Sequence, residues 1–142
     1  MLNDTPDLNA LQDFLGDAHQ LLGRGQECMQ HFRLIGEDAD ASYCLIHTLA
    51  SLRDKAQACK QMQIAGFCEQ LCAVLDPVAH RNQLHGPALE ILEACLCLLA
   101  WQVELIDPHS GALNLDAEEQ QELLESLDAT LRATTQSREQ MA

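Results

Sequence analysis

The residue of this sequence that is best placed for chemistry is His47. It lies in a stretch from about Asp40 to Cys59 whose apolar residues recur at steps of three and four, which predicts a helix. At about 100° per residue, these apolar side chains fall within one arc, and His47 lies on the opposite side. The arc is formed by Leu45, Leu49, Leu52, Ala56 and Cys59. The His47 imidazole is therefore expected to face solvent from the middle of an anchored helix.

The neighbours of His47 on this outer face are mostly small or polar. They are Tyr43, Cys44, Ala50, Ser51 and Asp54. Because Ala50 and Ser51 have short side chains, the surface just after His47 is low, and a partner protein is able to approach the ring closely. An exposed histidine on a helix is also an ordinary surface feature, so the geometry alone does not decide between the two interpretations.

Other patterns that carry chemistry are missing from the sequence. It has no phosphate-binding loop, no dinucleotide-binding glycine pattern, no HExxH and no GxSxG. A carboxylate-bridged di-metal bundle needs Glu-x-x-His pairs on two helices, and Glu90 and Glu93 have no histidine at that step. The remaining histidines are interpreted as surface or helix-end residues. We therefore expect no enzyme activity, no cofactor and no metal.

The seven cysteines are interpreted as small core residues. They are Cys28, Cys44, Cys59, Cys68, Cys72, Cys95 and Cys97. Their number is odd, all fall inside helical patterns, and none shows the paired CxxC spacing of a zinc site. We expect reduced thiols in a cytoplasmic protein.

Charge and hydropathy limit the partners. A net charge of −14 argues against binding to nucleic acid or to anionic membranes, and it permits a basic or amphipathic protein partner.

The most apolar stretch, Ala88 to Ile106, is interrupted by polar residues, so no membrane span is expected. The acidic N-terminus does not resemble a secretory signal. A cytoplasmic location and no membrane association are the expectations.

Five helices are expected to position His47, at about 8–34, 40–59, 61–75, 87–106 and 116–134. Asp76-Pro77 is expected to end the third helix. Asp116 with Glu119 predicts a capping box at the start of the fifth. The fourth helix is apolar on more than one face and is expected to be the most buried, whereas the tail after Thr134 is expected to fray.

The fold that these helices predict is an all-α single domain over residues 1–142. Apolar residues make up 47% of the chain, which is enough for a core built mainly from aliphatic side chains. Short links favour antiparallel neighbours. The prediction is an up-down antiparallel four-helix bundle with a fifth, C-terminal helix.

Three segments in this order resemble the histidine phosphotransfer (HPt) domain, particularly the type found at the N-terminus of chemotaxis histidine kinases. They are Phe14-Leu-Gly-Asp-Ala-His-Gln-Leu-Leu before an acidic turn, Leu45-Ile-His-Thr-Leu, and Phe67-Cys-Glu-Gln-Leu-Cys-Ala-Val-Leu-Asp76. The family carries an F-x-x-(D/E)-A-x-x-L-L-like pattern on its first helix and H-(S/T)-(L/I)-K-G on its second. The likeness covers about Asp13 to Asp76, and it extends loosely to the last two helices.

The resemblance implies a phosphoryl relay in a two-component pathway. The residue at the phospho-accepting position is His47, which would exchange a phosphoryl group with a histidine kinase or with the aspartate of a response-regulator receiver domain. Such a domain is a carrier without catalytic machinery of its own. The partner supplies the magnesium and the acidic pocket that stabilise the transferring group. Tyr43, Ala50, Ser51 and Asp54 are the expected docking surface around His47.

The chain departs from the family just after the histidine. The family usually has lysine three residues after it and glycine four residues after it, where this chain has Ala50 and Ser51. Asp54 lies two turns further on the His47 face, and its charge opposes a phosphoryl group. A degenerate HPt-like module that docks a response regulator or kinase without accepting phosphate is therefore an open alternative. A third hypothesis is a helical adaptor, dimeric through leucine and cysteine residues of the fourth helix.

Overall fold

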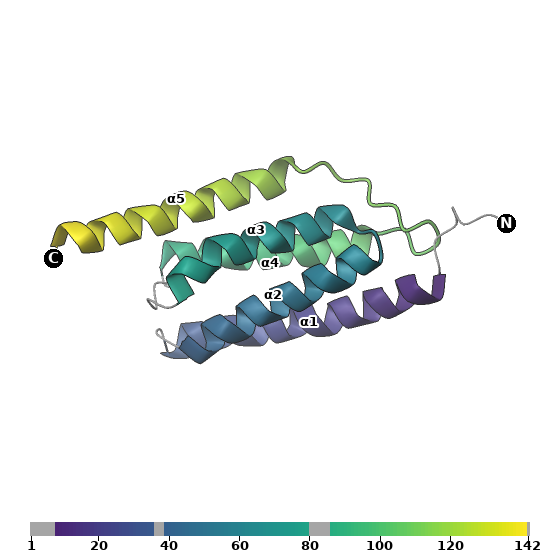
Figure 1. Cartoon of the computed structure of the whole chain (residues 1–142), viewed down its shortest axis with the longest axis horizontal. Helices are drawn as coiled ribbons and strands as arrows, with labels where there is room; N and C mark the ends of the chain where they lie inside the picture. The colour runs from purple at the N-terminus through teal and green to yellow at the C-terminus, as the bar shows by residue number, and fades with distance from the viewer. Residues whose placement is uncertain (1–7, 36–38, 80–85, 142) are drawn as a thin grey trace.

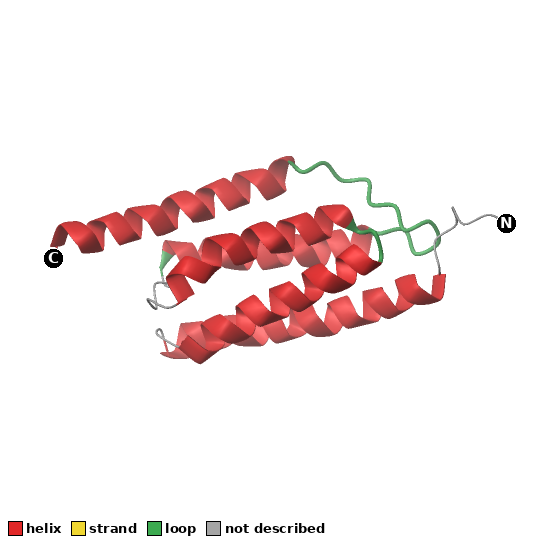
Figure 2. Cartoon of the chain, viewed as in Figure 1, coloured by secondary structure: helices red, strands yellow, loops and turns green. Residues whose placement is uncertain are grey.

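The computed structural model describes residues 8–35, 39–79 and 86–141, and its regular structure over these ranges is entirely helical (Figure 2). The helices are α1 (Leu8–Ile35), α2 (Ala39–Ala58), α3 (Met62–Ala79), α4 (Pro87–Leu105) and α5 (Glu118–Met141). For α1, α2 and α4, both ends agree with the predicted bounds to within one residue. The chain is thus all-α, as the sequence predicts. The predicted acidic turn at 36–38 lies outside the described residues, as do His80 and His85.

The first four helices lie alongside one another in a bundle (Figure 1). α2 packs between α1 and α3, while α4 packs against both α1 and α5 and touches α3. In the ribbon, each helix runs opposite to the helix before it (Figure 1). After α4, residues 106–117 form a long connection that carries the chain to α5, which lies against α4 and α3 (Figure 1). Among the described helices, α2 therefore has only α1 and α3 as neighbours, and one of its faces is not covered by a helix.

The core that anchors α2 is built from its inward leucines. Leu45, Leu49 and Leu52 are each at most 1% exposed, and Ala56 is fully buried. They belong to one core with buried residues of the other four helices, among them Phe14, Met29, Phe67, Leu71, Leu92, Leu96, Leu99 and Leu127. Full burial of a leucine side chain contributes about 1.5–3 kcal/mol. The inner face of α2 therefore fixes the rotation of this helix and, with it, the direction of His47.

The expected end of α3 at Asp76-Pro77 is wrong, because the helix continues to Ala79 with Pro77 inside it. Within a helix, proline removes one N–H donor and its ring crowds the carbonyl four residues earlier, and here this cost falls in the last turn of α3. Val78 is 6% exposed and belongs to the core. Its burial favours the extra turn over termination at the proline.

The last two helices differ from the expectations in detail. α4 is apolar on more than one face, yet Cys97, Trp101 and Leu105 are exposed on its outer face, and Trp101 is 62% exposed. The helices that flank α4 leave this stripe uncovered. α5 does not end near Thr134 but continues as a helix to Met141. α5 begins at Glu118 rather than near Asp116, and Asp116 Oδ1 caps this start by accepting a hydrogen bond from the Glu118 N–H at 3.0 Å, in place of the predicted capping box with Glu119.

The long connection before α5 is tied to the turn between α2 and α3. Lys60 adopts a left-handed conformation with φ 61°, and Gln61 Nε2 donates to the carbonyl oxygen of Gly111 at 2.8 Å. Gly111 itself has φ 76°, which suits a residue without a Cβ. At the end of α4, Asp107 Oδ1 accepts bonds from the N–H groups of His109 and Ser110. These contacts fix the end of the bundle that is remote from the α1–α2 connection.

Candidate functional site

His47 is exposed at the middle of α2, where the helical rotation places it. It follows Leu45 by two residues and precedes Leu49 by two, and both leucines are buried. A side chain halfway between two core residues of a helix points away from the core. The imidazole is therefore presented to solvent on a rigid element.

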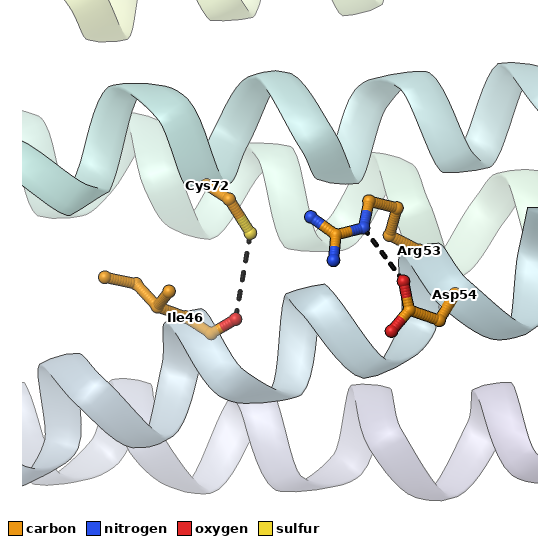
Figure 3. Close-up of polar contacts among 4 residues, drawn as sticks. All are labelled: Ile46, Arg53, Asp54 and Cys72. Atoms are coloured by element: carbon orange, nitrogen blue, oxygen red, sulfur yellow. Dashed lines mark hydrogen bonds and ion pairs between the residues drawn. The ribbon is translucent and has the colours of Figure 1, made fainter.

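Contacts on both sides of α2 define the width of this outer face. On the α1 side, Lys55 Nζ lies 3.3 Å from Asp17 Oδ2, and the Cys59 thiol donates to the carbonyl oxygen of Ala10. On the α3 side, the Cys72 thiol donates to the Ile46 carbonyl oxygen at 3.7 Å (Figure 3). The face between these two edges contains His47.

The other predicted docking residues share this face with His47. Tyr43 and Asp54 are exposed, while Ala50 and Ser51 are half-buried. Positions 43, 47, 50 and 54 recur at steps of four and three, which is the spacing of one helix face. Thr48, next to His47, points inward and donates its hydroxyl to the Cys44 carbonyl oxygen at 2.7 Å. The structure thus brings the predicted residues together around the imidazole.

The basic residues that follow His47 on α2 are engaged by carboxylates. Arg53 Nε donates to Asp54 Oδ1 at 3.1 Å (Figure 3), and this hydrogen bond and the adjacent charge raise the pKa of the Arg53 guanidinium. Lys55 is paired with Asp17 across the α1–α2 interface. The Asp54 side chain is 67% exposed and lies on the His47 face. The α2 surface next to His47 therefore offers a carboxylate and no free cation of its own.

A hollow of about 240 Å³ lies between α1 and α2 on the side of Cys44. It is lined by Arg24, Glu27, Cys28, His31, Asp40, Ala41 and Cys44. The sequence patterns did not predict that Arg24 lies beside Cys44, one helical turn before His47. A signal was nevertheless present, because Ala10, Asp17, Arg24 and His31 recur every seven residues and so lie along one line of α1.

A larger groove of about 680 Å³ lies between α3 and α5. Apolar side chains such as Val74, Val78, Leu124 and Leu131 line most of it. His47 lines neither this groove nor the hollow between α1 and α2. The exposed imidazole therefore lies outside both of these cavities.

The cysteines differ in exposure, and all seven are free thiols. Burial raises the pKa of the Cys68 and Cys95 thiols to about 12. Burial, together with a hydrogen bond to Cys44, raises the pKa of the Cys28 thiol to about 12 as well. Cys44 and Cys97 are exposed, so the expectation that every cysteine is a core residue is wrong for these two.

Neither a metal site nor a membrane span is present in the described parts of the chain. Over residues 8–35, 39–79 and 86–141, no three histidine, cysteine or acidic side chains gather in a way that would hold a metal ion. Among the described helices, none has the length and apolar character needed to cross a bilayer. Comparison of the chain with protein-family models, with curated proteins and with solved structures gives no match.

Proposed function

We propose that this chain is a histidine-containing phosphotransfer protein that carries a phosphoryl group on His47 in a two-component pathway, phosphorelay or chemotaxis-like, in the cytoplasm. The observation that carries the proposal is the exposed imidazole at the centre of α2, flanked by the small residues Ala50 and Ser51. The helical bundle and the three segments around Phe14, His47 and Phe67 support it. The proposal includes the up-down four-helix arrangement of the HPt fold, with α5 as an addition.

The transfer itself requires little from this chain. A lone pair of a His47 ring nitrogen attacks the phosphorus of an aspartyl phosphate on a receiver domain. The N–P bond forms as the P–O bond to the aspartate breaks, the carboxylate leaves with the electron pair, and the proton on the other ring nitrogen stays in place. The reverse step, or transfer from a kinase, has the same balance. Positioning and charge stabilisation come mainly from the partner's site.

The exposed position of the His47 imidazole suits a transfer in which the partner supplies the active site. The receiver domain or kinase must enclose the histidine in its own active site, so the ring has to stand clear of the surrounding side chains. Ala50 and Ser51 keep the surface beside His47 low, and Leu45, Leu49 and Leu52 hold the backbone rigidly below it. Placement on a rigid helix makes the position of the ring reproducible from one encounter to the next.

The test is transfer of labelled phosphate to the purified chain from phosphorylated receiver domains and from active histidine kinases. Label that survives base and is lost in acid identifies phosphohistidine. His47→Gln is expected to abolish it without loss of stability, because the side chain is exposed. His19→Gln is the matched control, since His19 is exposed on α1. Label that persists in the His47→Gln variant would exclude the proposed site.

A second candidate function is a binding module that docks a receiver domain or kinase without accepting phosphate. The observation that favours it is the charge beside His47, where Asp54 is exposed and Arg53 is bonded to it. This hypothesis predicts a stable complex and no label. Calorimetric titration of His47→Ala against a partner separates the two, because a docking module retains its affinity.

A further inference from the structure

The geometry points to Arg24 on α1 as the residue that supplies positive charge to a phosphoryl group on His47, in place of a lysine on α2 itself. This inference rests on the proposed function and names the electrostatic partner of the same site. Three observations support it. The register of α1 against α2 brings Arg24 close to the His47 level, and the α2 residues between the two side chains are small. The nearest basic residues of α2 already form ion pairs with carboxylates.

The register of α1 against α2 places Arg24 level with Thr48, the residue next to His47. Asp17 on α1 lies beside Lys55 on α2 at 3.3 Å. The two helices run in opposite directions (Figure 1), so seven residues forward on α1 and seven residues back on α2 bring Arg24 level with Thr48. Four further residues on each helix give Cys28 and Cys44, which line the same hollow between the two helices. The Asp17–Lys55 contact and this shared lining therefore agree on one register on either side of Arg24.

Arg24 also lies on the correct line of α1. Ala10 and Asp17, seven and fourteen residues before it, both contact α2. Seven residues are close to two helical turns, so Arg24 continues the line that faces the outer edge of α2. Its side chain lines the hollow with Cys44, which lies one turn before His47. Cys44 and Ser51 are the α2 residues between this edge and His47, and both are small.

The charges around His47 make Arg24 the cation available for this role. Arg53 is bonded to Asp54, and Lys55 is paired with Asp17. Among the described residues, Arg24 forms no ion pair of this kind, and it is exposed. Glu27 lines the same hollow one turn further along α1 and competes for the guanidinium. A modest effect is therefore expected, of the size usual for exposed charges.

The experiment uses phosphoramidate, an anionic donor that phosphorylates histidine without a protein partner. A His47 ring nitrogen attacks its phosphorus, the N–P bond of the donor breaks, and ammonia leaves. The full chain is treated as wild type and as the Arg24→Gln, Arg24→Lys and Arg132→Gln variants. Arg132 is the matched control, because its side chain is 76% exposed on the remote helix α5. Mass spectrometry compares label on His47 with label on the exposed His109.

Arg24→Gln is expected to slow labelling of His47 relative to His109 by about two- to fourfold, whereas Arg24→Lys restores most of the rate. The difference is expected to shrink in 1 M salt, because the Debye length there is about 3 Å. A rate for Arg24→Gln equal to that of the wild type, or an equal fall for Arg132→Gln, would overturn the inference. Failure of the proposed function has a different result from failure of the Arg24 inference. If the proposed function is wrong, the wild type takes no label on His47 from any phosphorylated receiver domain.

Discussion

Restoring a lysine at position 50 is the most informative perturbation of the candidate site. Ala50 lies three residues after His47 on the same face of α2 and is half-buried, so the stem of a lysine has room to lie along the surface. Residues three apart on a helix have Cβ atoms about 5–6 Å apart. Ala50→Lys is therefore expected to bring an ammonium group close to a phosphoryl group on His47 and to stabilise it.

The magnitude follows from Coulomb's law. Two unit charges about 6 Å apart in water interact by about 0.7 kcal/mol, and a phosphoryl group with about two negative charges doubles this value. Screening at physiological ionic strength, where the Debye length is about 8 Å, halves the sum to about 0.7 kcal/mol. This corresponds to roughly threefold in rate. Asp54 lies one turn after position 50 and attracts the new lysine, so Asp54→Asn in addition is expected to increase the gain.

The assay is the initial rate of His47 labelling by phosphoramidate, measured by mass spectrometry for the wild type, Ala50→Lys, and Ala50→Lys with Asp54→Asn. Ala50→Gln is the uncharged control of similar length. Circular dichroism checks that the helical content is unchanged. Equal rates for the lysine and glutamine variants, in low salt and with intact helices, would refute the electrostatic reasoning.

Three further predictions test the packing that holds α2 and α5. Leu49→Ala is expected to lower the free energy of unfolding by about 2–5 kcal/mol in urea titrations, since Leu49 is 1% exposed; a loss well under 1 kcal/mol would contradict its placement. Gln102 Nε2 donates to Gln120 Oε1 at 3.0 Å, while Gln102 Oε1 is buried without a partner among the described residues. Gln102→Leu alone leaves Gln120 Oε1 without its donor and is therefore expected to cost about 1 kcal/mol, whereas adding Gln120→Leu removes that oxygen too and is expected to recover the loss; a double variant less stable than the single one would count against this. Iodoacetamide at neutral pH is expected to alkylate Cys44 well before Cys68, whose burial raises its pKa to about 12, and equal rates by mass spectrometry would show that the core opens readily.

The sequence was sufficient to predict α2 and the direction of His47. The leucines at 45, 49 and 52 form an unbroken inner stripe, and a stripe of this kind fixes the rotation of a helix without any knowledge of its neighbours. The exposure of His47 and the grouping of Tyr43 with Asp54 on its face depend on this rotation alone. Local periodicity therefore decided these features.

Features that depend on tertiary packing were not predictable in the same way. Pro77 remains helical because Val78 is buried, and that burial depends on contacts that the local sequence does not show. Trp101 is exposed because the described helices leave the outer face of α4 uncovered, although the residue type favours burial. The place of Arg24 beside the His47 face depends on the register of α1 against α2, which the Asp17–Lys55 pair reveals only in the folded chain.

The central claim is that His47 accepts a phosphoryl group on a ring nitrogen. The most direct measurement is a long-range ¹H–¹⁵N correlation spectrum of the histidine rings, recorded before and after incubation with a phosphorylated receiver domain. We predict that, of all the histidines, His47 shows a change in the ¹⁵N chemical shift of a ring nitrogen. We also predict that this change reverses when unphosphorylated receiver domain is added. Unchanged His47 signals across receiver domains that form a complex with the chain, or equal changes at His19 and His109, would contradict it.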